Sequence, residues 1–290
     1  MKKINDKWGG IAFIILAGFC FALMTFFVRL SGDLPTMQKV FFRNFVAALV
    51  AAFLLSRSEE KFHIKKSSWV SLILRSTFGM LGMICNFYAI DKLNIADANI
   101  LNKLSPFFAI IASYFILREK ANKVEWACVA VAFTGAIFVV KPSFNMDFVY
   151  AMIGALGGLG AGIAYTYVRK LGKLGERGNV IVFFFSTFTS LGTLPFMIAT
   201  YQQMSWEQLM ILMGAGVAAA GGQLCITRAY FYAPAKEISV FDYTQVIFAA
   251  LLGFVFLGQI PDWISVLGYV IIIGSAVFKW MYLKRSTNNS

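Results

Sequence analysis

Ten long apolar segments run through this sequence, each close to the roughly 20 residues that a helix needs to cross a bilayer. Their length and the lack of period-two alternation favour helices over strands, and in lipid a helix satisfies its backbone hydrogen bonds within one segment. With 59% hydrophobic and 14% charged residues, the chain is far more apolar than a soluble domain. We predict an all-α integral membrane protein with ten transmembrane helices, at 10–30, 35–55, 68–90, 95–117, 123–141, 149–169, 179–200, 206–230, 236–257 and 262–283.

The second half of the chain repeats the first after 140 residues. A shift without gaps superposes identical residues: Val28-Arg29 on Val168-Arg169, Phe45 on Phe185, Gly82 on Gly222 and Phe108 on Phe248. Each copy holds five segments, and an odd number of crossings sends the second copy into the membrane from the opposite side. We therefore predict two inverted five-helix repeats, residues 1–145 and 146–290, which let a central site open to either face. A duplication that only builds a stable bundle is less favoured, because polar residues recur at equivalent positions.

The basic residues alternate between loops, and this alternation predicts the orientation. The loops after the second, fourth and sixth segments are rich in lysine and arginine, such as Arg57, Lys61, Lys65 and Lys66, whereas the intervening loops hold few. Cytoplasmic loops carry the positive charge, so we expect both termini on the cytoplasmic side of a bacterial-type inner membrane. The same rule explains the net charge of +12, and no nucleic-acid partner is expected.

Polar residues interrupt the fourth and ninth segments at matching positions. The steps i, i+3, i+4 and i+7 share one face of a helix, and they hold Asn99, Asn102, Lys103 and Pro106 in one segment and Ser239, Asp242, Tyr243 and Val246 in the other. A charged side chain in the hydrocarbon region costs at least about 2.5 kcal/mol on insertion scales. Lys103 and Asp242 should therefore face the bundle interior or a wet cavity and handle substrate or protons. Structural ion pairing is the alternative.

The depth of each charged residue in the membrane can be estimated from the helical rise of about 1.5 Å per residue. Arg75 and Asp242 lie at the same level, roughly 10 Å below the inner surface, which would allow an ion pair. Lys103 lies roughly 12 Å below the outer surface, with Arg43 at similar depth. For Arg43 a structural anchoring role is favoured over a role in substrate handling.

Eleven side chains at these depths are the predicted substrate-binding residues. Amides, phenols and methionine can orient a ligand and bury its apolar part, although an aromatic residue in so phenylalanine-rich a bundle more often serves packing. Asp242 is also the candidate residue for ion coupling. The predicted set is Arg75, Met83, Asn86, Asn99, Asn102, Lys103, Tyr165, Gln223, Thr227, Asp242 and Tyr243.

Glycine and proline shape the sixth and fourth segments. Gly154, Gly158 and Gly162 recur every four residues, a spacing that predicts close helix approach, either as a sliding gate or as static packing. Pro106 removes a backbone donor and is expected to kink the fourth segment beside the polar stripe.

The sequence offers no catalytic or metal-binding set. His63 is the only histidine and lies in a basic loop, so no histidine-based triad or two-histidine metal site can form within the membrane. The four cysteines fall in apolar segments without metal-ligand spacing, and no Walker-type phosphate loop is present to bind ATP. We expect no catalytic residue, no metal and no cofactor; transport would use a proton or ion gradient, or the gradient of the substrate itself.

Three stretches carry a family resemblance: VFFRNFVAALVAAFLL at 40–55, FYAIDKLNIADANILNKLSPFFAIIASYFILREK at 87–120 and WACVAVAFTGAIFVVKP at 126–142. Their arginine near the start of the second segment, the proline-centred fourth segment and the terminal Leu117-Arg118-Glu119 resemble the ten-helix EamA-type members of the drug/metabolite transporter superfamily. The resemblance covers nearly the whole chain. Gln259 departs from the family pattern, in which an acidic residue is common at this position, and this departure weakens the case for a required carboxylate there.

The resemblance implies a secondary carrier with a central cavity lined by segments 1, 3, 4, 6, 8 and 9, but it does not choose the substrate. The arrangement of Arg75 with Phe41-Phe42-Arg43 is similar to a branch that includes S-adenosylmethionine carriers. Lys103 and Arg75 facing a cavity would favour a carboxylate-bearing or zwitterionic ligand. We expect alternating-access transport of a small organic metabolite, such as an amino acid or an S-adenosylmethionine-like compound.

Other functions are compatible with these features to different degrees. A multidrug or toxic-compound exporter would have the same architecture. A membrane-embedded enzyme would need a compact catalytic set on one face, and a structural or sensor protein would have no use for paired polar stripes. The expected partners are the small-molecule substrate, a proton or other coupling ion and membrane lipids, with the carrier acting as a monomer or homodimer.

Overall fold

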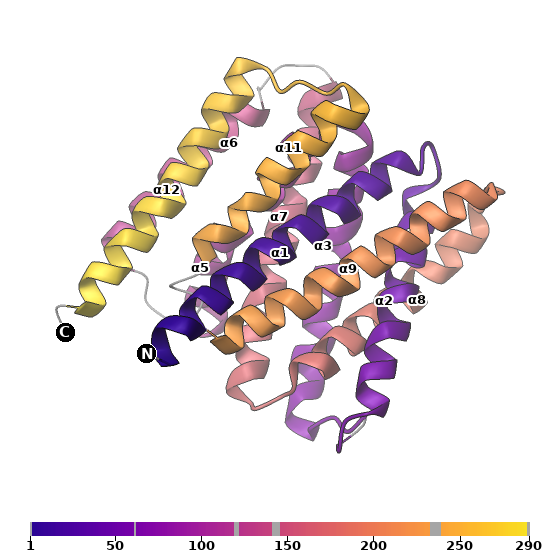
Figure 1. Ribbon diagram of the computed structural model, residues 1–290, viewed down its shortest axis with the longest axis horizontal. Helices are drawn as coiled ribbons and strands as arrows, with labels where there is room; N and C mark the ends of the chain where they lie inside the picture. The colour runs from indigo at the N-terminus through magenta and orange to yellow at the C-terminus, as the bar shows by residue number, and fades with distance from the viewer. Residues whose placement is uncertain (1, 61, 119–121, 141–145, 233–238, 289–290) are drawn as a thin grey trace.

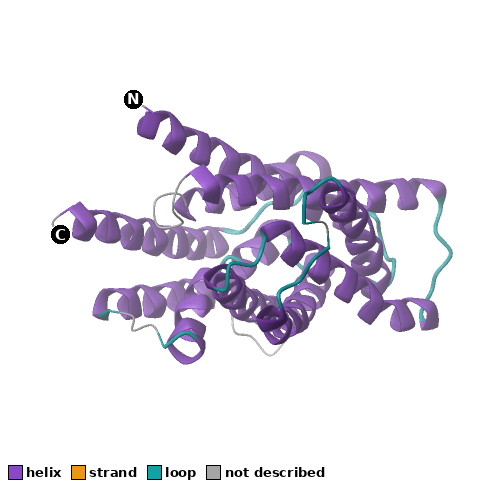
Figure 2. Cartoon of the chain, turned by 90° about the horizontal axis from the view of Figure 1, so that it is seen from below, coloured by secondary structure: helices purple, strands orange, loops and turns teal. Residues whose placement is uncertain are grey.

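The computed structural model describes residues 2–60, 62–118, 122–140, 146–232 and 239–288, and this part of the chain contains helices and no strand. The long helices run side by side, and the start of α1 and the end of α12 lie at the same end of the bundle (Figures 1 and 2). The elements are α1 (Lys2–Leu30), α2 (Thr36–Ser56), η1 (Lys66–Ser68), α3 (Trp69–Lys92), α4 (Ile95–Asn102), α5 (Ser105–Ile116), α6 (Lys123–Val140), α7 (Met146–Lys173), α8 (Gly178–Ala199), α9 (Trp206–Tyr232), η2 (Ser239–Tyr243), α11 (Thr244–Leu257) and α12 (Trp263–Asn288).

The length and composition of the helices fit a membrane. Eight stretches of described helix are long and apolar enough to span one, and residues 241–257 form a shorter apolar helix. Helix α6 adds another 18 apolar-rich residues. Large apolar side chains such as Phe53, Leu81, Phe115 and Val217 are at least half exposed, as expected where the surface contacts lipid instead of water. The predicted all-α membrane fold is confirmed.

The fourth predicted span is interrupted instead of continuous. Helix α4 ends at Asn102, and α5 begins at Ser105 after a two-residue turn. Pro106 explains the break, because a proline has no N–H to donate to the carbonyl of Asn102, four residues earlier. Where the sequence predicted a kink, the helix is fully interrupted. Asn99 and Lys103 were expected to lie on one helical face with Pro106, but that face ends at the turn.

The ninth predicted span is irregular at the matching place. The 3-10 helix η2 ends at Tyr243, the repeat counterpart of Lys103, and α11 begins at the next residue. The start of the predicted span, residues 236–238, lies outside the described residues. Each half therefore has one span that departs from regular α-helix at matching positions of the repeat, by a turn at 103–104 and by 3-10 geometry up to Tyr243.

Helix packing is preserved when the two halves are exchanged. In the repeat, α1 corresponds to α7, α2 to α8 and α3 to α9. Helix α3 packs along α7 as α9 packs along α1, while α2 packs on α8 and α6 on α12 (Figure 1). Inverted repeats related by a pseudo-two-fold axis produce this pattern. The predicted division after residue 145 falls at 141–145, outside the described residues, and stays a prediction.

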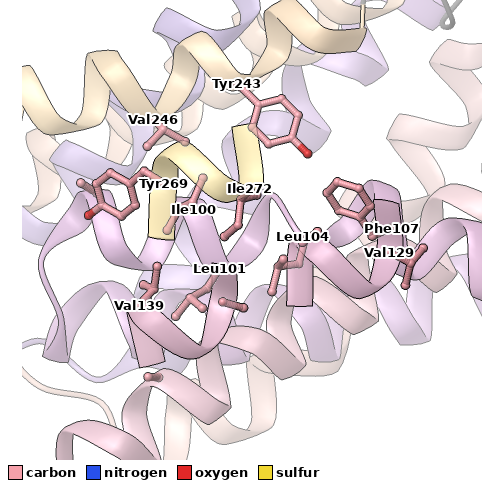
Figure 3. Packing of buried hydrophobic residues seen from close by; sticks show 14 of the residues in the cluster. Ile100, Leu101, Leu104, Phe107, Val129, Val139, Tyr243, Val246, Tyr269 and Ile272 are labelled. Atoms are coloured by element: carbon pink, nitrogen blue, oxygen red, sulfur yellow. The ribbon is translucent and has the colours of Figure 1, made fainter. Parts of the chain in front are cut away.

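A buried apolar cluster holds the interrupted fourth helix on both sides of its break. Side chains before and after the turn pack against α6, α11 and α12 (Figure 3). Between helices in a membrane such contacts act through van der Waals packing, and here they hold α4 and α5 in place despite the missing backbone bonds. Its members include Ile100, Leu101, Leu104, Phe107, Val129, Val139, Val246 and Ile272.

Glycines bring α7 into direct contact with the backbone of α4 and α5. A Cβ atom on Gly158 would lie 2.6 Å from the carbonyl oxygen of Leu101, and one on Gly162 would lie 2.6 Å from Cβ of Phe108. These distances are shorter than any normal contact, so only glycine fits at these two positions. The close helix approach predicted from the glycine spacing is confirmed.

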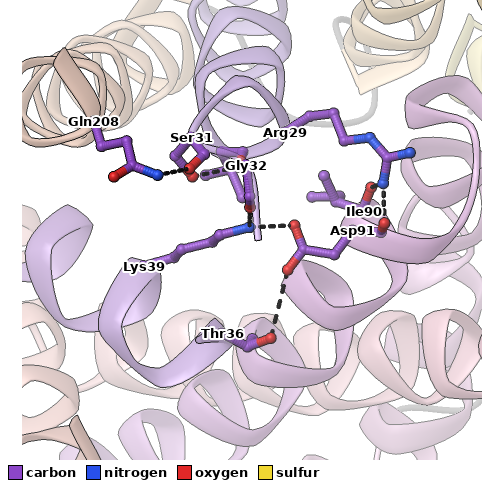
Figure 4. A network of polar contacts seen from close by, with 9 residues as sticks. Arg29, Ser31, Gly32, Thr36, Lys39, Ile90, Asp91 and Gln208 are labelled. Carbon is purple, nitrogen blue, oxygen red and sulfur yellow. Dashed lines mark hydrogen bonds and ion pairs between the residues drawn. The ribbon is translucent and has the colours of Figure 1, made fainter. Parts of the chain in front are cut away.

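A polar network joins the helix ends far from the termini (Figure 4). Lys39 donates to Asp91 Oδ1 and to the Gly32 carbonyl, each at 2.6 Å. Arg29 donates to the carbonyl of Asp91, and Gln208 of α9 donates to the chain just after α1 at 3.1 Å. These bonds connect α1, α2, α3 and α9 across the repeat boundary.

At the opposite end, the loop after α2 contacts the loop after α7. Arg177 and Glu60 form an ion pair at 3.1 Å, and the Lys65 backbone N–H donates to Glu176 at 3.2 Å. Both ends of the bundle therefore have polar contacts between the halves, with an apolar belt between them.

Candidate functional site

A cavity of about 110 Å³ lies at the centre of the bundle, between the helices of both halves. Aromatic, methionine and glycine surface forms much of its wall, with polar groups that converge on it, as in ligand pockets generally. Its polar and charged lining residues are Thr25, Arg43, Arg75, Asn86, Asn102, Lys103, Tyr165, Gln223, Asp242 and Gln245.

The cavity follows the symmetry of the repeats. Six pairs of lining residues are separated by 140 positions: Phe21 with Ala161, Met24 with Ala164, Thr25 with Tyr165, Met83 with Gln223, Asn86 with Ile226, and Asn102 with Asp242. Equivalent faces of both halves therefore form the wall, which places the cavity on the axis that relates them.

The irregular segments of the fourth and ninth spans contact each other at this wall. Lys103 Nζ donates to Asp242 Oδ2 at 2.5 Å, and the Tyr243 hydroxyl donates to the Lys103 carbonyl at 3.1 Å. Because the turn at 103–104 interrupts the regular helical bonding pattern, the hydroxyl gives that carbonyl a partner from the other half. An ion pair and a hydrogen bond thus link the two halves where their fourth and ninth spans are irregular.

A chain of buried amides lies behind this ion pair. Gln245 donates to Asn99 Oδ1 at 2.5 Å, and Asn99 donates to the Thr25 hydroxyl at 3.2 Å. Asn99 is 1% exposed and lies behind the cavity wall, whereas Gln245 and Thr25 are part of that wall. Its contacts orient the groups that face the cavity.

Two arginines complete the polar wall. Arg75 lies with its guanidinium 3.7 Å from the centre of the Phe185 ring, a cation–π contact. Arg43 donates to the Asn44 side-chain oxygen at 2.7 Å and lines the cavity, although the sequence favoured an anchoring role for it. The Arg75–Asp242 ion pair that equal depth would allow is not formed, because Lys103 occupies Asp242.

Eight of the eleven predicted substrate-binding residues line the cavity: Arg75, Met83, Asn86, Asn102, Lys103, Tyr165, Gln223 and Asp242. Asn99 and Tyr243 lie behind the lining and hold its members in place. Thr227 belongs to α9, but its side chain lies outside the described part of the structure. That these residues bind substrate, and that Asp242 couples an ion, stay predictions.

Sequence reasoning missed several lining residues. Thr25 is the repeat counterpart of the predicted Tyr165, and Phe21 faces the same wall one helical turn earlier. The 140-residue shift applied to each candidate would have found Thr25. Phe185 had no such signal, because its role comes from its contact with Arg75.

The chemistry of the wall suits binding. The described residues contain no group of three or more His, Cys, Asp or Glu side chains that could hold a metal ion. What the wall does offer is guanidinium, ammonium, amide and hydroxyl donors beside apolar surface, which can hold an organic ligand in one orientation.

Comparison with known proteins decides the family. The sequence profile of the EamA-like transporter family matches residues 8–141 and again residues 150–281. The chain belongs to the EamA-like transporter family. This EamA-like protein is therefore a multi-pass membrane transporter of a small molecule and not an enzyme.

Full-length relatives of this EamA-like chain carry transporter names. It is 30% identical to the pseudopaline exporter CntI of Pseudomonas aeruginosa strain UCBPP-PA14, over 92% of this chain and 94% of the relative. It is 26% identical to human solute carrier family 35 member G1, over 96% and 82% of the two chains. A solved crystal structure superposes with a TM-score of 0.68 over 96% of this chain and 99% of the other, at 14% identity, which supports the fold.

Proposed function

We propose that this chain is a secondary active transporter that moves a small organic metabolite across the cytoplasmic membrane by alternating access. The observation that carries the proposal is the contact between the irregular segments of the fourth and ninth spans, where Lys103 and Tyr243, at equivalent repeat positions, join the halves beside the central cavity. Transporters with inverted repeats place their substrate sites where interrupted helices meet near the bilayer midplane.

The Lys103–Asp242 pair supplies the switch in this mechanism. Its side chains are 9% and 20% exposed, and a buried ion pair contributes little to stability once the loss of hydration is counted. A substrate carboxylate that binds Lys103, or a proton that neutralises Asp242, competes with the pair and loosens the contact between the halves. Asp242 is thus the proposed coupling residue, and a carboxylate-bearing or zwitterionic metabolite is the proposed substrate.

The proposed site of action is a bacterial-type inner membrane, with both termini in the cytoplasm and basic loops on that side. The similarity to a pseudopaline exporter supports transport of a small organic molecule. The relatives support no enzymatic alternative, because those with functional names are named as transporters, exporters or solute carriers.

The test is uptake into proteoliposomes that contain the purified full chain. Labelled amino acids, nucleosides, vitamins, organic acids and S-adenosylmethionine would be presented with and without a pH gradient. Lys103→Ala and Asp242→Asn are compared with Lys92→Ala and Glu207→Gln, which change exposed charges away from the cavity.

We expect saturable transport of one chemical class, lost or uncoupled from the pH gradient in the two cavity variants and retained in both controls. Transport that is unchanged in Lys103→Ala and Asp242→Asn would place the site elsewhere. A folded protein that moves no compound on a broad panel would contradict the transport function itself.

A further inference from the structure

The charges of the cavity wall do not balance. Four charged side chains line it: Arg43, Arg75, Lys103 and Asp242. Lys103 and Asp242 neutralise each other at 2.5 Å, so among the described residues of the wall the two guanidinium charges have no counter-charge. The nearby acidic residues of the described chain are engaged elsewhere, because Asp91 pairs with Lys39 at the end of the bundle and Asp97 accepts a bond from Tyr269 at 2.6 Å.

Both guanidinium groups also keep unused donors. Arg43 and Arg75 are 3% and 6% exposed. Among the described residues, Arg43 Nε and Arg75 Nε and Nη1 are buried without a hydrogen-bond partner. A buried, unpaired charge is costly, and a guanidinium presents its donors in a planar fork that matches a carboxylate or phosphate group.

Neighbouring residues hold both arginines in place. Arg75 stacks on Phe185, and a Cβ atom on Gly79 would lie 2.9 Å from that ring and 3.1 Å from Arg75 Nη1. Gly79 thus leaves the space in which the guanidinium stacks. Arg43 is held by Asn44, which donates in turn to the Val40 carbonyl at 2.8 Å. Donors fixed in this way lose little entropy when a ligand binds.

The arginines break the symmetry of an otherwise paired wall. Their repeat counterparts are Phe183 and Ala215, which carry no charge. These two positive charges therefore come from the first half of the chain alone, although both halves contribute residues to the wall. They would favour anionic ligands over neutral ones. Unused acceptors are present too, since Asp242 Oδ1 and Asn86 Oδ1 have no hydrogen-bond partner within the described part of the chain.

From this wall we infer that the transported molecule is an organic dianion. Its two negative charges, on two carboxylates or on one phosphate, are balanced by Arg43 and Arg75, and a hydroxyl donor on it faces Asp242 and Asn86. The inference rests on the proposed transport function and narrows its substrate class. It disfavours a cation such as S-adenosylmethionine and a zwitterion without net charge, because neither balances two guanidinium groups.

Binding to the purified full chain in detergent tests the charge requirement separately from transport. The probes are glutarate, glutamate and glutamine, which differ in charge at similar size, with glycerol 3-phosphate as a phosphate dianion and S-adenosylmethionine as a cation. Ligand-dependent thermal stabilisation, titrated for each probe, gives an apparent Kd. Arg43→Gln and Arg75→Gln are compared with Arg57→Gln, whose guanidinium lies over Phe53 outside the cavity.

We expect the dianions to bind at least 10-fold more tightly than glutamine, and each cavity variant to weaken dianion binding about 10-fold to 100-fold, as for loss of a charge-assisted hydrogen bond. Arg57→Gln should bind like the wild type. If a glutamine variant fails to fold, Arg43→Lys and Arg75→Lys replace it, and they should weaken binding while keeping the charge. Preference for glycerol 3-phosphate over glutarate would support the inference and identify phosphate as the anionic group.

Failure of the inference and failure of transport give different results. Equal or tighter binding of glutamine or S-adenosylmethionine, no binding of any dianion, or unchanged dianion binding in the Arg43→Gln/Arg75→Gln double variant would overturn the inference. The same panel in proteoliposomes then reports on transport: uptake of a zwitterion alone leaves the carrier function intact and removes the dianion. Dianion binding without uptake of any probe supports the site and contradicts the carrier.

Discussion

Lys103 and Tyr243 occupy equivalent positions in the two repeats, yet they contribute different contacts. Lys103 supplies an ammonium group to Asp242, and Tyr243 supplies a hydroxyl to the backbone at the opposite break. In the proposed mechanism, Lys103 carries the charge that a substrate or proton displaces, whereas Tyr243 makes a neutral hydrogen bond that links the two halves.

Removing the Tyr243 hydroxyl should destabilise the contact between the halves. In Tyr243→Phe the Lys103 carbonyl loses a buried partner, which costs about 1–3 kcal/mol. Thermal unfolding in detergent should show a lower Tm than the wild type, while Tyr201→Phe, an exposed tyrosine, should unfold like the wild type. An unchanged Tm in Tyr243→Phe would show that the hydroxyl bond contributes nothing.

The ion pair should show non-additive effects on stability. Lys103→Met leaves Asp242 without its cation and should lower the free energy of unfolding by up to about 3 kcal/mol. Adding Asp242→Asn removes the isolated charge and should restore part of that loss. Chemical denaturation of both single variants and the double variant measures the coupling, and strictly additive losses would contradict a direct pair.

At single positions, the sequence predicted which charges face the interior but not which of them meet. The insertion cost of a charge indicated that Lys103 and Asp242 point away from lipid. Depth counted along an unbroken helix then paired Asp242 with Arg75, because it ignored the reach of the lysine side chain. Arg43 was assigned to anchoring for a related reason, since sequence position does not show the cavity in front of it.

At the scale of elements, the sequence predicted the fourth and ninth spans but not all of their irregularities. The apolar runs predicted the spans, and Pro106 indicated a disturbance in the fourth. The ninth has Val246 at the equivalent position, so no proline indicates its change from 3-10 to α-helix at Thr244. The resemblance between the halves was the available clue, because a break in one repeat favours a break in the other.

The glycine contacts of α7 allow a matched test within one helix. Gly158→Ala would place a Cβ atom 2.6 Å from the Leu101 carbonyl oxygen and force α4 and α7 apart. We expect a loss of about 1–3 kcal/mol from this overpacking, and reduced transport because α4 carries Asn102 to the cavity wall. Gly172→Ala, with no atom within 4 Å of the added carbon, should be neutral or slightly stabilising. Equal Tm values for both variants would contradict the close contact.

The whole molecule is arranged by the repeat, and the 140-residue shift in the sequence already indicates that arrangement. Each half lines the cavity with equivalent positions, and its helices pack as the exchange of halves requires. Ten spans return the chain to its starting side, which agrees with the start of α1 and the end of α12 at one end of the bundle (Figure 2). The positive-inside rule predicts that this end faces the cytoplasm.

Reporter fusions test this orientation. Alkaline phosphatase, which is active only outside the cytoplasm, should be inactive at either terminus and active when inserted in the short connection between α8 and α9, at 201–205. A fluorescent protein that folds in the cytoplasm should show the reverse pattern. Opposite locations for the two termini would contradict an even number of crossings.

The most direct test of alternating access at this cavity is solvent access from both sides of the membrane. Met83→Cys places a thiol in the cavity wall, and Leu81→Cys places one on the lipid-facing side of the same helix, each in a chain whose four native cysteines are replaced by serine. A charged, membrane-impermeant thiol reagent is then applied to right-side-out and to inside-out vesicles. We predict that Met83→Cys reacts in both orientations and Leu81→Cys in neither; reaction of Met83→Cys from one side only would contradict alternating access.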